Sequence, residues 1–176
     1  MQNLLLLRPF YGLEKTLVIT CHECVQQEKN DQIFAYQCLG NMLRKADHLQ
    51  QECIRHYLET EGCRQIILAG HYNCHVIKKI FNDPDEYSSR TVLQYNLEAL
   101  LKEHEHRPLP PVLKDKVLIE ANVIEQLKLL MSYDFVFKKV ETEKLKVIGV
   151  VLDYQANTTK EIFRNGIIFN NLIISN

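Results

Sequence analysis

The sequence lacks an excess of charge of either sign. Its 21 lysine and arginine residues nearly balance its 22 aspartate and glutamate residues, which gives a formal net charge of −1 at pH 7. A protein that binds nucleic acid or an anionic membrane through its overall electric field needs a clear surplus of basic residues. We therefore expect neither nucleic acid nor a membrane among the partners.

Long hydrophobic runs are missing as well. The opening stretch Leu4-Leu5-Leu6-Leu7 is interrupted by Arg8 and Pro9, whereas a helix that crosses a bilayer needs about 20 mostly apolar residues. No cleavage pattern of a signal peptide follows this stretch. On these grounds we expect a soluble protein with a cytoplasmic location.

The cysteines do not form the pattern of a disulfide framework. There are six of them, at positions 21, 24, 38, 53, 63 and 74, and their spacing is unlike that of small secreted proteins. In a reducing compartment, cysteines more often bind a metal ion or lie buried as apolar side chains. We expect these two roles here.

What the sequence does contain is an alternation of apolar strands and amphipathic helices. With 176 residues, 46% of them hydrophobic, the chain is long enough to bury one core, and we expect a single domain over residues 1–176. We predict strands at 16–20, 34–36, 66–70 and 145–152, one or two more within 163–174, helices at 42–61, 91–104 and 117–132, a short helix or turn at 76–81 and an extended connector at 107–111. This order predicts an α/β fold with a central, mainly parallel β-sheet flanked by helices.

Two short motifs follow two of these strands. Cys21-His22-Glu23-Cys24 comes after residues 16–20, and His71-Tyr72-Asn73-Cys74 comes after residues 66–70. Ligands of parallel sheets bind beyond the carboxyl ends of the strands, which lie side by side. Cys21, His71 and Cys74 would then offer two thiolates and one imidazole, and this set leaves one position of a tetrahedral zinc ion open, as catalytic zinc sites do.

These motifs resemble those of the β-class carbonic anhydrases. That family carries Cys-x-Asp-x-Arg, Phe-x-x-Arg-Asn-x-Gly-Asn and Gly-His-x-x-Cys-Gly, in this order. The matching stretches here are Cys-His-Glu-Cys-Val at 21–25, Phe-Ala-Tyr-Gln-Cys-Leu-Gly-Asn at 34–41 and Gly-His-Tyr-Asn-Cys-His at 70–75. The stretch 120–154 also fits, so the resemblance covers about residues 14–155 and leaves 156–176 as a C-terminal strand extension.

The resemblance implies both a cofactor and a reaction. It implies that Cys21, His71 and Cys74 bind Zn2+, and that the protein is a homodimer or a dimer of dimers. The family reaction is the reversible hydration of carbon dioxide to bicarbonate by a zinc-bound hydroxide. Glu23 would accept a hydrogen bond from that hydroxide, and we hypothesise that His75 or His22 transfers the proton to solvent.

The sequence departs from the family pattern around the metal. Glu23 stands where the family has Asp, and Val25 stands where it has the Arg that holds this Asp away from the metal. Valine cannot make the charge-assisted hydrogen bond of that arginine. Glu23 could therefore occupy the fourth position on the zinc or find another donor, with His22 the nearest in sequence. His75 replaces the family Gly, and Gln37-Cys38 replaces the family Arg-Asn.

Several functions remain open from the sequence. The three ligands and the carboxylate at position 23 favour a zinc lyase that acts on carbon dioxide or on another small linear molecule such as carbon disulfide. Val25, Gln37 and His75 favour a catalytically impaired zinc-binding homologue with a binding or regulatory role.

Two alternatives need no zinc. Cys21-x-x-Cys24 could be a thiol redox pair, although this would leave the motif at 71–74 unexplained. Cys21 and Cys74 could also be buried apolar thiols, with His71 a histidine that merely ends a strand.

Overall fold

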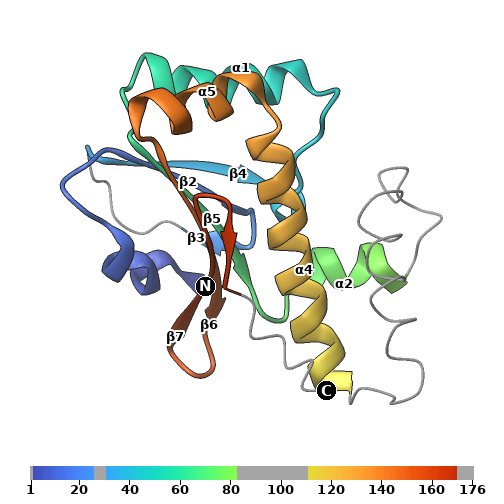
Figure 1. Cartoon of the computed structure of the whole chain (residues 1–176). Coiled ribbons are helices and arrows are strands. Elements are labelled where there is room, and N and C mark those ends of the chain that lie inside the picture. The colour runs from blue at the N-terminus through green and yellow to red at the C-terminus, as the bar shows by residue number, and fades with distance from the viewer. Residues whose placement is uncertain (1, 26–30, 83–110, 170–176) are drawn as a thin grey trace.

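The central element of the computed structural model is a six-stranded sheet (Figure 1). The structure describes residues 2–25, 31–82 and 111–169. In spatial order the strands are β4 (Ile33–Cys38), β2 (Thr16–Cys21), β5 (Gln65–His71), β6 (Lys146–Asp153), β7 (Thr158–Arg164) and β8 (Ile167–Ile168). The first four are mutually parallel, and β7 and β8 join antiparallel. This confirms the predicted α/β fold.

The two strands that precede the motifs are the most deeply buried. Every residue of β2 and every residue of β5 is buried. Strands of a parallel sheet that is covered on both faces show such continuous apolar runs, because neither face meets water. The burial agrees with the apolar character of residues 16–20 and 66–70 in the sequence.

Three helices cover one face of the sheet. They are α1 (His48–Glu59), α4 (Pro111–Met131) and α5 (Asp134–Glu143). The side chain of Tyr57 on α1 packs on Phe34 of β4, with ring centroids 5.5 Å apart. Arg55, also on α1, lies 4.8 Å from the ring of Phe135 on α5. Helices α1 and α5 therefore lie side by side, as Figure 1 shows.

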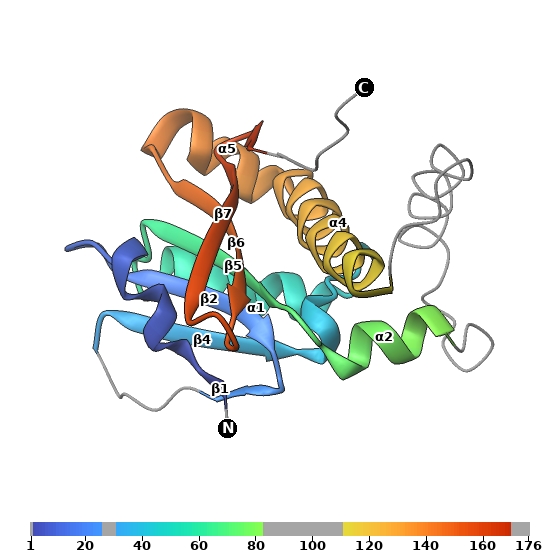
Figure 2. The same ribbon diagram turned by 90° about the horizontal axis from the view of Figure 1, so that it is seen from below.

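The N-terminal segment covers the opposite face. Gln65 and Gly70 lie five positions apart on β5, so they face opposite sides of the sheet. Gly70 faces α4, whereas the Gln65 side chain donates to the carbonyl of Phe10 in the 3-10 helix η1 (Leu4–Phe10) at 2.8 Å. Figure 2 shows the sheet between this segment and α4. A short parallel pair, β1 (Gln2–Asn3) with β3 (Cys24–Val25), which we did not predict, adds to the N-terminal side.

Two glycines allow α4 to lie close against the sheet. A Cβ added to Gly70 would lie 2.5 Å from Cγ2 of Val123, and one added to Gly149 would collide with Cδ1 of Leu127 and lie 3.0 Å from Cβ of Phe163. Val123 and Leu127 are both fully buried in the core. The absence of a side chain at these two positions thus sets the distance between helix and sheet.

We expect the substitution Gly149→Ala to lower the free energy of unfolding by about 1–3 kcal/mol, because overpacking forces core side chains to shift. Urea unfolding followed by circular dichroism measures this. Gly12→Ala is the matched control, since its added Cβ would meet nothing closer than the Glu14 amide nitrogen at 3.9 Å. Equal stability of the two variants would contradict this account of the packing.

The predicted helix at 42–61 begins later than expected. In the structure α1 begins at His48, and Leu49 in its first turn is 76% exposed. The backbone before His48 hydrogen-bonds to buried amide side chains instead of forming a helix. The N–H of Leu43 donates to Oε1 of Gln126 at 2.7 Å, and the N–H of Arg44 donates to Oε1 of Gln50. Asp47 then caps α1 by accepting from the N–H of Gln50.

The other helix predictions have mixed outcomes. The predicted segment 76–81 is the helix α2 (His75–Asn82), and the predicted helix 117–132 begins six residues earlier, at Pro111, because proline is well tolerated in the first turn of a helix. The predicted helix 91–104 and most of the connector 107–111 lie outside the described residues.

Within the described part of the chain, no helix has the length and apolar character needed to cross a membrane.

The C-terminal strands form a hairpin. β7 begins at Thr158, five residues before the predicted start, and is joined to β8 by Asn165-Gly166. These two residues have φ values of +47° and +90°, and Asn-Gly is the preferred pair for a two-residue turn with positive φ. Residues 170–174 of the predicted strand region lie outside the described residues.

Candidate functional site

The two sequence motifs meet at the carboxyl ends of β2 and β5. Cys21 is the last residue of β2, His71 is the last residue of β5, and Cys74 comes directly before α2. One ligand atom each of Cys21, Glu23, His71 and Cys74 lies within 4.8 Å of the other three. We call these four atoms the donor cluster. Parallel pairing of Thr20 with Ala69 sets the register that brings them together.

The spacing of the donor cluster fits a tetrahedral zinc ion along two opposite edges. Two sulfurs bound to zinc at about 2.3 Å lie about 3.8 Å apart in a tetrahedron, and the sulfurs of Cys21 and Cys74 are 3.8 Å apart. A nitrogen and an oxygen bound at about 2.0–2.1 Å lie about 3.3–3.4 Å apart, and Nε2 of His71 is 3.3 Å from Oε2 of Glu23. The residues present therefore fit zinc.

The imidazole of His71 points an unpartnered nitrogen into the cluster. Its Nδ1 lies 3.2 Å from the carbonyl oxygen of Tyr72. A carbonyl only accepts, so Nδ1 carries the proton and Nε2 keeps its lone pair. Nε2 is buried and makes no hydrogen bond, because without a proton it cannot donate to the nearby Glu23 carboxylate, which only accepts. Fixing one nitrogen by a backbone carbonyl is how metal-binding histidines are oriented.

The two thiols of the cluster differ in how readily they lose their protons. The thiol of Cys74 donates to the sulfur of Cys21, and this hydrogen bond lowers the pKa of Cys21 against the opposing effect of burial. The same hydrogen bond and burial raise the pKa of Cys74. Of the two, Cys21 therefore loses its proton more readily, and the thiolate is the form in which cysteine binds metal ions.

The Glu23 carboxylate is held by His75. Its Oε2 accepts a hydrogen bond from the backbone N–H of His75 at 3.2 Å, and its Oε1 lies 3.2 Å from Nδ1 of the same residue. His22, which we named from the sequence as the nearest donor, lies instead with Nδ1 3.7 Å from the sulfur of Cys21. Of the predicted site residues, the structure thus brings Glu23 and His75 together and places His22 apart from the carboxylate.

Cys24 is buried outside the donor cluster. Its sulfur accepts a hydrogen bond from the hydroxyl of Tyr154 at 3.5 Å, and its backbone carbonyl accepts one from Nε2 of Gln37. Burial raises the pKa of Cys24. All six cysteines are free thiols. The sulfur that contacts Cys21 is that of Cys74, at 3.8 Å.

Buried amide side chains next to the site, which we did not predict from the sequence, hold its backbone in place. Nδ2 of Asn41 donates to the carbonyl of Ala69 at 2.7 Å, and Nδ2 of Asn122 on α4 donates to the carbonyl of Gly40 at 2.9 Å. These bonds fix the 3-10 turn η2 (Leu39–Asn41), whose backbone at Gly40 also hydrogen-bonds to the Cys21 sulfur. The sequence did hold one signal for this layer. Asn122 and Gln126 lie four residues apart on the buried side of α4, and buried amides need hydrogen-bond partners.

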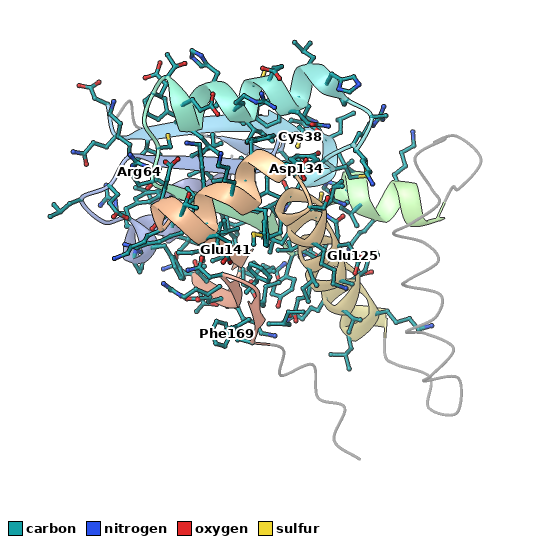
Figure 3. The ribbon with its side chains drawn as sticks, turned by 45° about the horizontal axis from the view of Figure 1, so that its top comes forward. Cys38, Arg64, Glu125, Asp134, Glu141 and Phe169 are labelled. Carbon is teal, nitrogen blue, oxygen red and sulfur yellow. The ribbon has the colours of Figure 1, made fainter. Side chains whose placement is uncertain are left out.

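Cys38 borders this turn at the end of β4 (Figure 3). Burial raises its pKa to about 12, so it remains a neutral thiol, and its carbonyl accepts a hydrogen bond from the backbone N–H of His22. Cys63 is buried, and the pKa of its thiol is raised to about 11 by burial. Neither thiol belongs to the donor cluster.

Comparisons with known proteins agree with this arrangement. The model of the carbonic anhydrase family matches residues 17–159. The chain is similar to a mutant form of the β-carbonic anhydrase CafD of Aspergillus fumigatus, with 23% identity over 85% of this chain and 90% of that one and a TM-score of 0.71. No curated protein matches the chain.

Two further solved structures show the same fold at lower identity. The β-carbonic anhydrase CcaA has 18% identity over 85% of this chain and 79% of its own, with a TM-score of 0.71. A β-carbonic anhydrase of Sordaria macrospora, described as tetrameric, has 16% identity over 88% of this chain and 83% of its own, with a TM-score of 0.67. The family match spans most of the chain and the fold is that of the β-class, so the chain belongs to the carbonic anhydrase family.

Proposed function

We propose that the protein catalyses the zinc-dependent, reversible hydration of carbon dioxide to bicarbonate. The observation that carries this proposal is the donor cluster, in which two sulfurs, a carboxylate oxygen and the unpartnered Nε2 of His71 converge within 4.8 Å. A buried imidazole nitrogen without a partner is costly unless a ligand satisfies it. The family to which the chain belongs supports the reaction.

The roles of the residues follow from their positions. Cys21, His71 and Cys74 would hold the zinc ion, which when bound lowers the pKa of a coordinated water to about 7. Glu23 lies at the fourth corner of the cluster. Once withdrawn from that corner, its carboxylate would accept a hydrogen bond from a water and orient it. The side chain of His75 is 88% exposed, which suits transfer of the proton to solvent.

One observation favours a second candidate function. Oε2 of Glu23, at 3.3 Å from Nε2 of His71, stands where substrate water would have to bind. A zinc ion with four protein ligands is typical of a structural site. If Glu23 stays there, the protein is a zinc-stabilised homologue with a binding or regulatory role rather than a lyase.

Stopped-flow measurement of carbon dioxide hydration separates the two functions. We expect the zinc-loaded protein to accelerate hydration, and the same preparation treated with a chelator to lose the acceleration. Carbon disulfide is assayed in parallel as the alternative small linear substrate. A fully zinc-loaded, folded protein that leaves the spontaneous rate of hydration unchanged would refute the proposed activity. It would favour the zinc-stabilised homologue with a binding or regulatory role.

We further propose a single domain over residues 1–176 that forms a homodimer or a dimer of dimers in the cytoplasm. Support for assembly comes from the exposed apolar side chains of Ile167, Ile168 and Phe169 at one edge of the sheet, where Figure 3 labels Phe169. An unpaired strand edge favours association. Size-exclusion chromatography with light scattering measures the oligomeric state directly.

A further inference from the structure

The Glu23 carboxylate has two donors from a single residue. The backbone N–H of His75 reaches Oε2 and the ring Nδ1 of His75 reaches Oε1, each at 3.2 Å. A carboxylate only accepts, so Nδ1 carries the proton in this contact. The two bonds form a fork that fixes both oxygens at once, and such a fork defines the orientation of a carboxylate in the way that a bidentate arginine does.

The backbone donor belongs to the start of a helix. His75 is the first residue of α2, and the first N–H groups of a helix have no partner within the helix. The helix dipole adds partial positive charge at this end, which favours a carboxylate. Among the described residues, no lysine or arginine forms an ion pair with Glu23. His75, at the start of α2, therefore supplies the hydrogen-bond donors that the valine at position 25 cannot.

This fork places the carboxylate at one defined point. While His75 holds both oxygens, Oε2 remains 3.3 Å from Nε2 of His71, which is the spacing of two zinc ligands. Only 20% of the Glu23 side chain is exposed, so the carboxylate faces the cluster rather than solvent. Glu23 and His75 lie 52 positions apart in the chain, and the contact thus also ties the loop after β2 to α2.

We propose that His75 is a positioning residue, which holds the Glu23 carboxylate at the fourth corner of the donor cluster whenever no water occupies that corner. This rests on the zinc site of the proposed function but is independent of proton transfer. A residue that merely carried protons to solvent would leave the affinity for zinc unchanged, whereas a residue that orients a ligand alters it. Loss of such a supporting partner commonly lowers metal affinity about 10–100-fold.

Competition between the purified protein and a chromophoric zinc chelator tests the proposal. We expect His75→Ala to weaken zinc binding about 10-fold, at the lower end of this range because the backbone N–H remains. His75→Asn should retain the affinity within about threefold, since its Nδ2 occupies the position of the histidine Nδ1 and can donate in the same way. In a Glu23→Ala background, His75→Ala should cause no further loss, because the carboxylate it positions is gone.

The controls separate failure of this inference from failure of the zinc site. His56→Ala removes another exposed histidine, whose ring contacts Glu61 3.6 Å away, and should leave zinc affinity unchanged. Unchanged affinity in His75→Ala, or an equal loss in the presence and absence of Glu23, overturns the positioning role while the zinc site stands. A wild-type protein that binds no zinc in this assay overturns both.

Discussion

Replacing Cys21 with alanine is expected to reduce bound zinc from about one ion per chain to less than about a tenth, together with any carbon dioxide hydration. Cys21 is the thiol of the cluster that ionises more readily, since the hydrogen bond from Cys74 lowers its pKa. Its loss leaves one sulfur, one imidazole and one carboxylate, a set that holds zinc far more weakly. Metal analysis of protein purified in the presence of zinc and then desalted measures the effect.

Cys24→Ala is the matched control for this experiment. Cys24 is the nearest cysteine in sequence and is also buried, but it lies outside the donor cluster and contacts the hydroxyl of Tyr154. We expect this variant to retain its zinc. Full zinc in Cys21→Ala would refute the ligand assignment. Loss of zinc in Cys24→Ala with retention in Cys21→Ala would show that the wrong cysteine of the motif was chosen.

The elements that locate the site could be predicted from the sequence because their signals are local. Residues 16–20 and 66–70 are continuous apolar runs, which only a sheet covered on both faces accommodates. Because parallel strands end at a common edge, side chains that follow two such strands are brought together whatever lies between them. Cys21 and His71 were therefore predictable neighbours, and the structure places Nε2 of His71 and the sulfur of Cys21 in one cluster.

The contacts that define how the site works could not be predicted, because they are long-range and polar. The partner of Glu23 was expected nearby in sequence, at His22, but the backbone and ring of His75 on another element reach the carboxylate. The start of α1 was misplaced for a similar reason. The apolar residues within 42–47 have helical spacing, but backbone N–H groups of this segment donate to buried amide side chains of α4 and α1. Periodicity carries no information about such competition.

Glu120 is the position where we expect the largest loss of stability outside the proposed zinc ligands. It lies on α4 and is almost fully buried. The hydroxyl of Tyr72 donates to its Oε1 at 2.6 Å, and Nζ of Lys160 lies 2.9 Å from both oxygens. Burial, followed by this contact with Glu120, raises the pKa of Tyr72, so the phenol remains a donor. The carboxylate is therefore fully compensated in the folded state.

Glu120→Ala should lower the free energy of unfolding by about 3 kcal/mol, because removal of one partner leaves the other groups buried without compensation. The value is at the lower end of the range for buried ion pairs, since the Lys160 side chain is 39% exposed and can regain water. Urea unfolding of the zinc-free protein measures it. Glu14→Ala is the control: its ion pair with Lys146 has a similar distance of 2.8 Å but is exposed at both ends, and we expect a change of at most about 0.5 kcal/mol.

The same variant is expected to affect the metal site through Tyr72. The carbonyl of Tyr72 orients the imidazole of His71, while its phenol is anchored by Glu120. Without that anchor the backbone at residue 72 has more freedom, and zinc affinity should fall together with stability. Glu120→Gln keeps an acceptor for the phenol and should recover most of the zinc affinity while recovering less of the stability, because the ammonium of Lys160 still lacks its counter-charge. If Glu120→Ala were as stable as Glu14→Ala and bound zinc like the wild type, burial of this carboxylate would have no part in holding the strand end at His71.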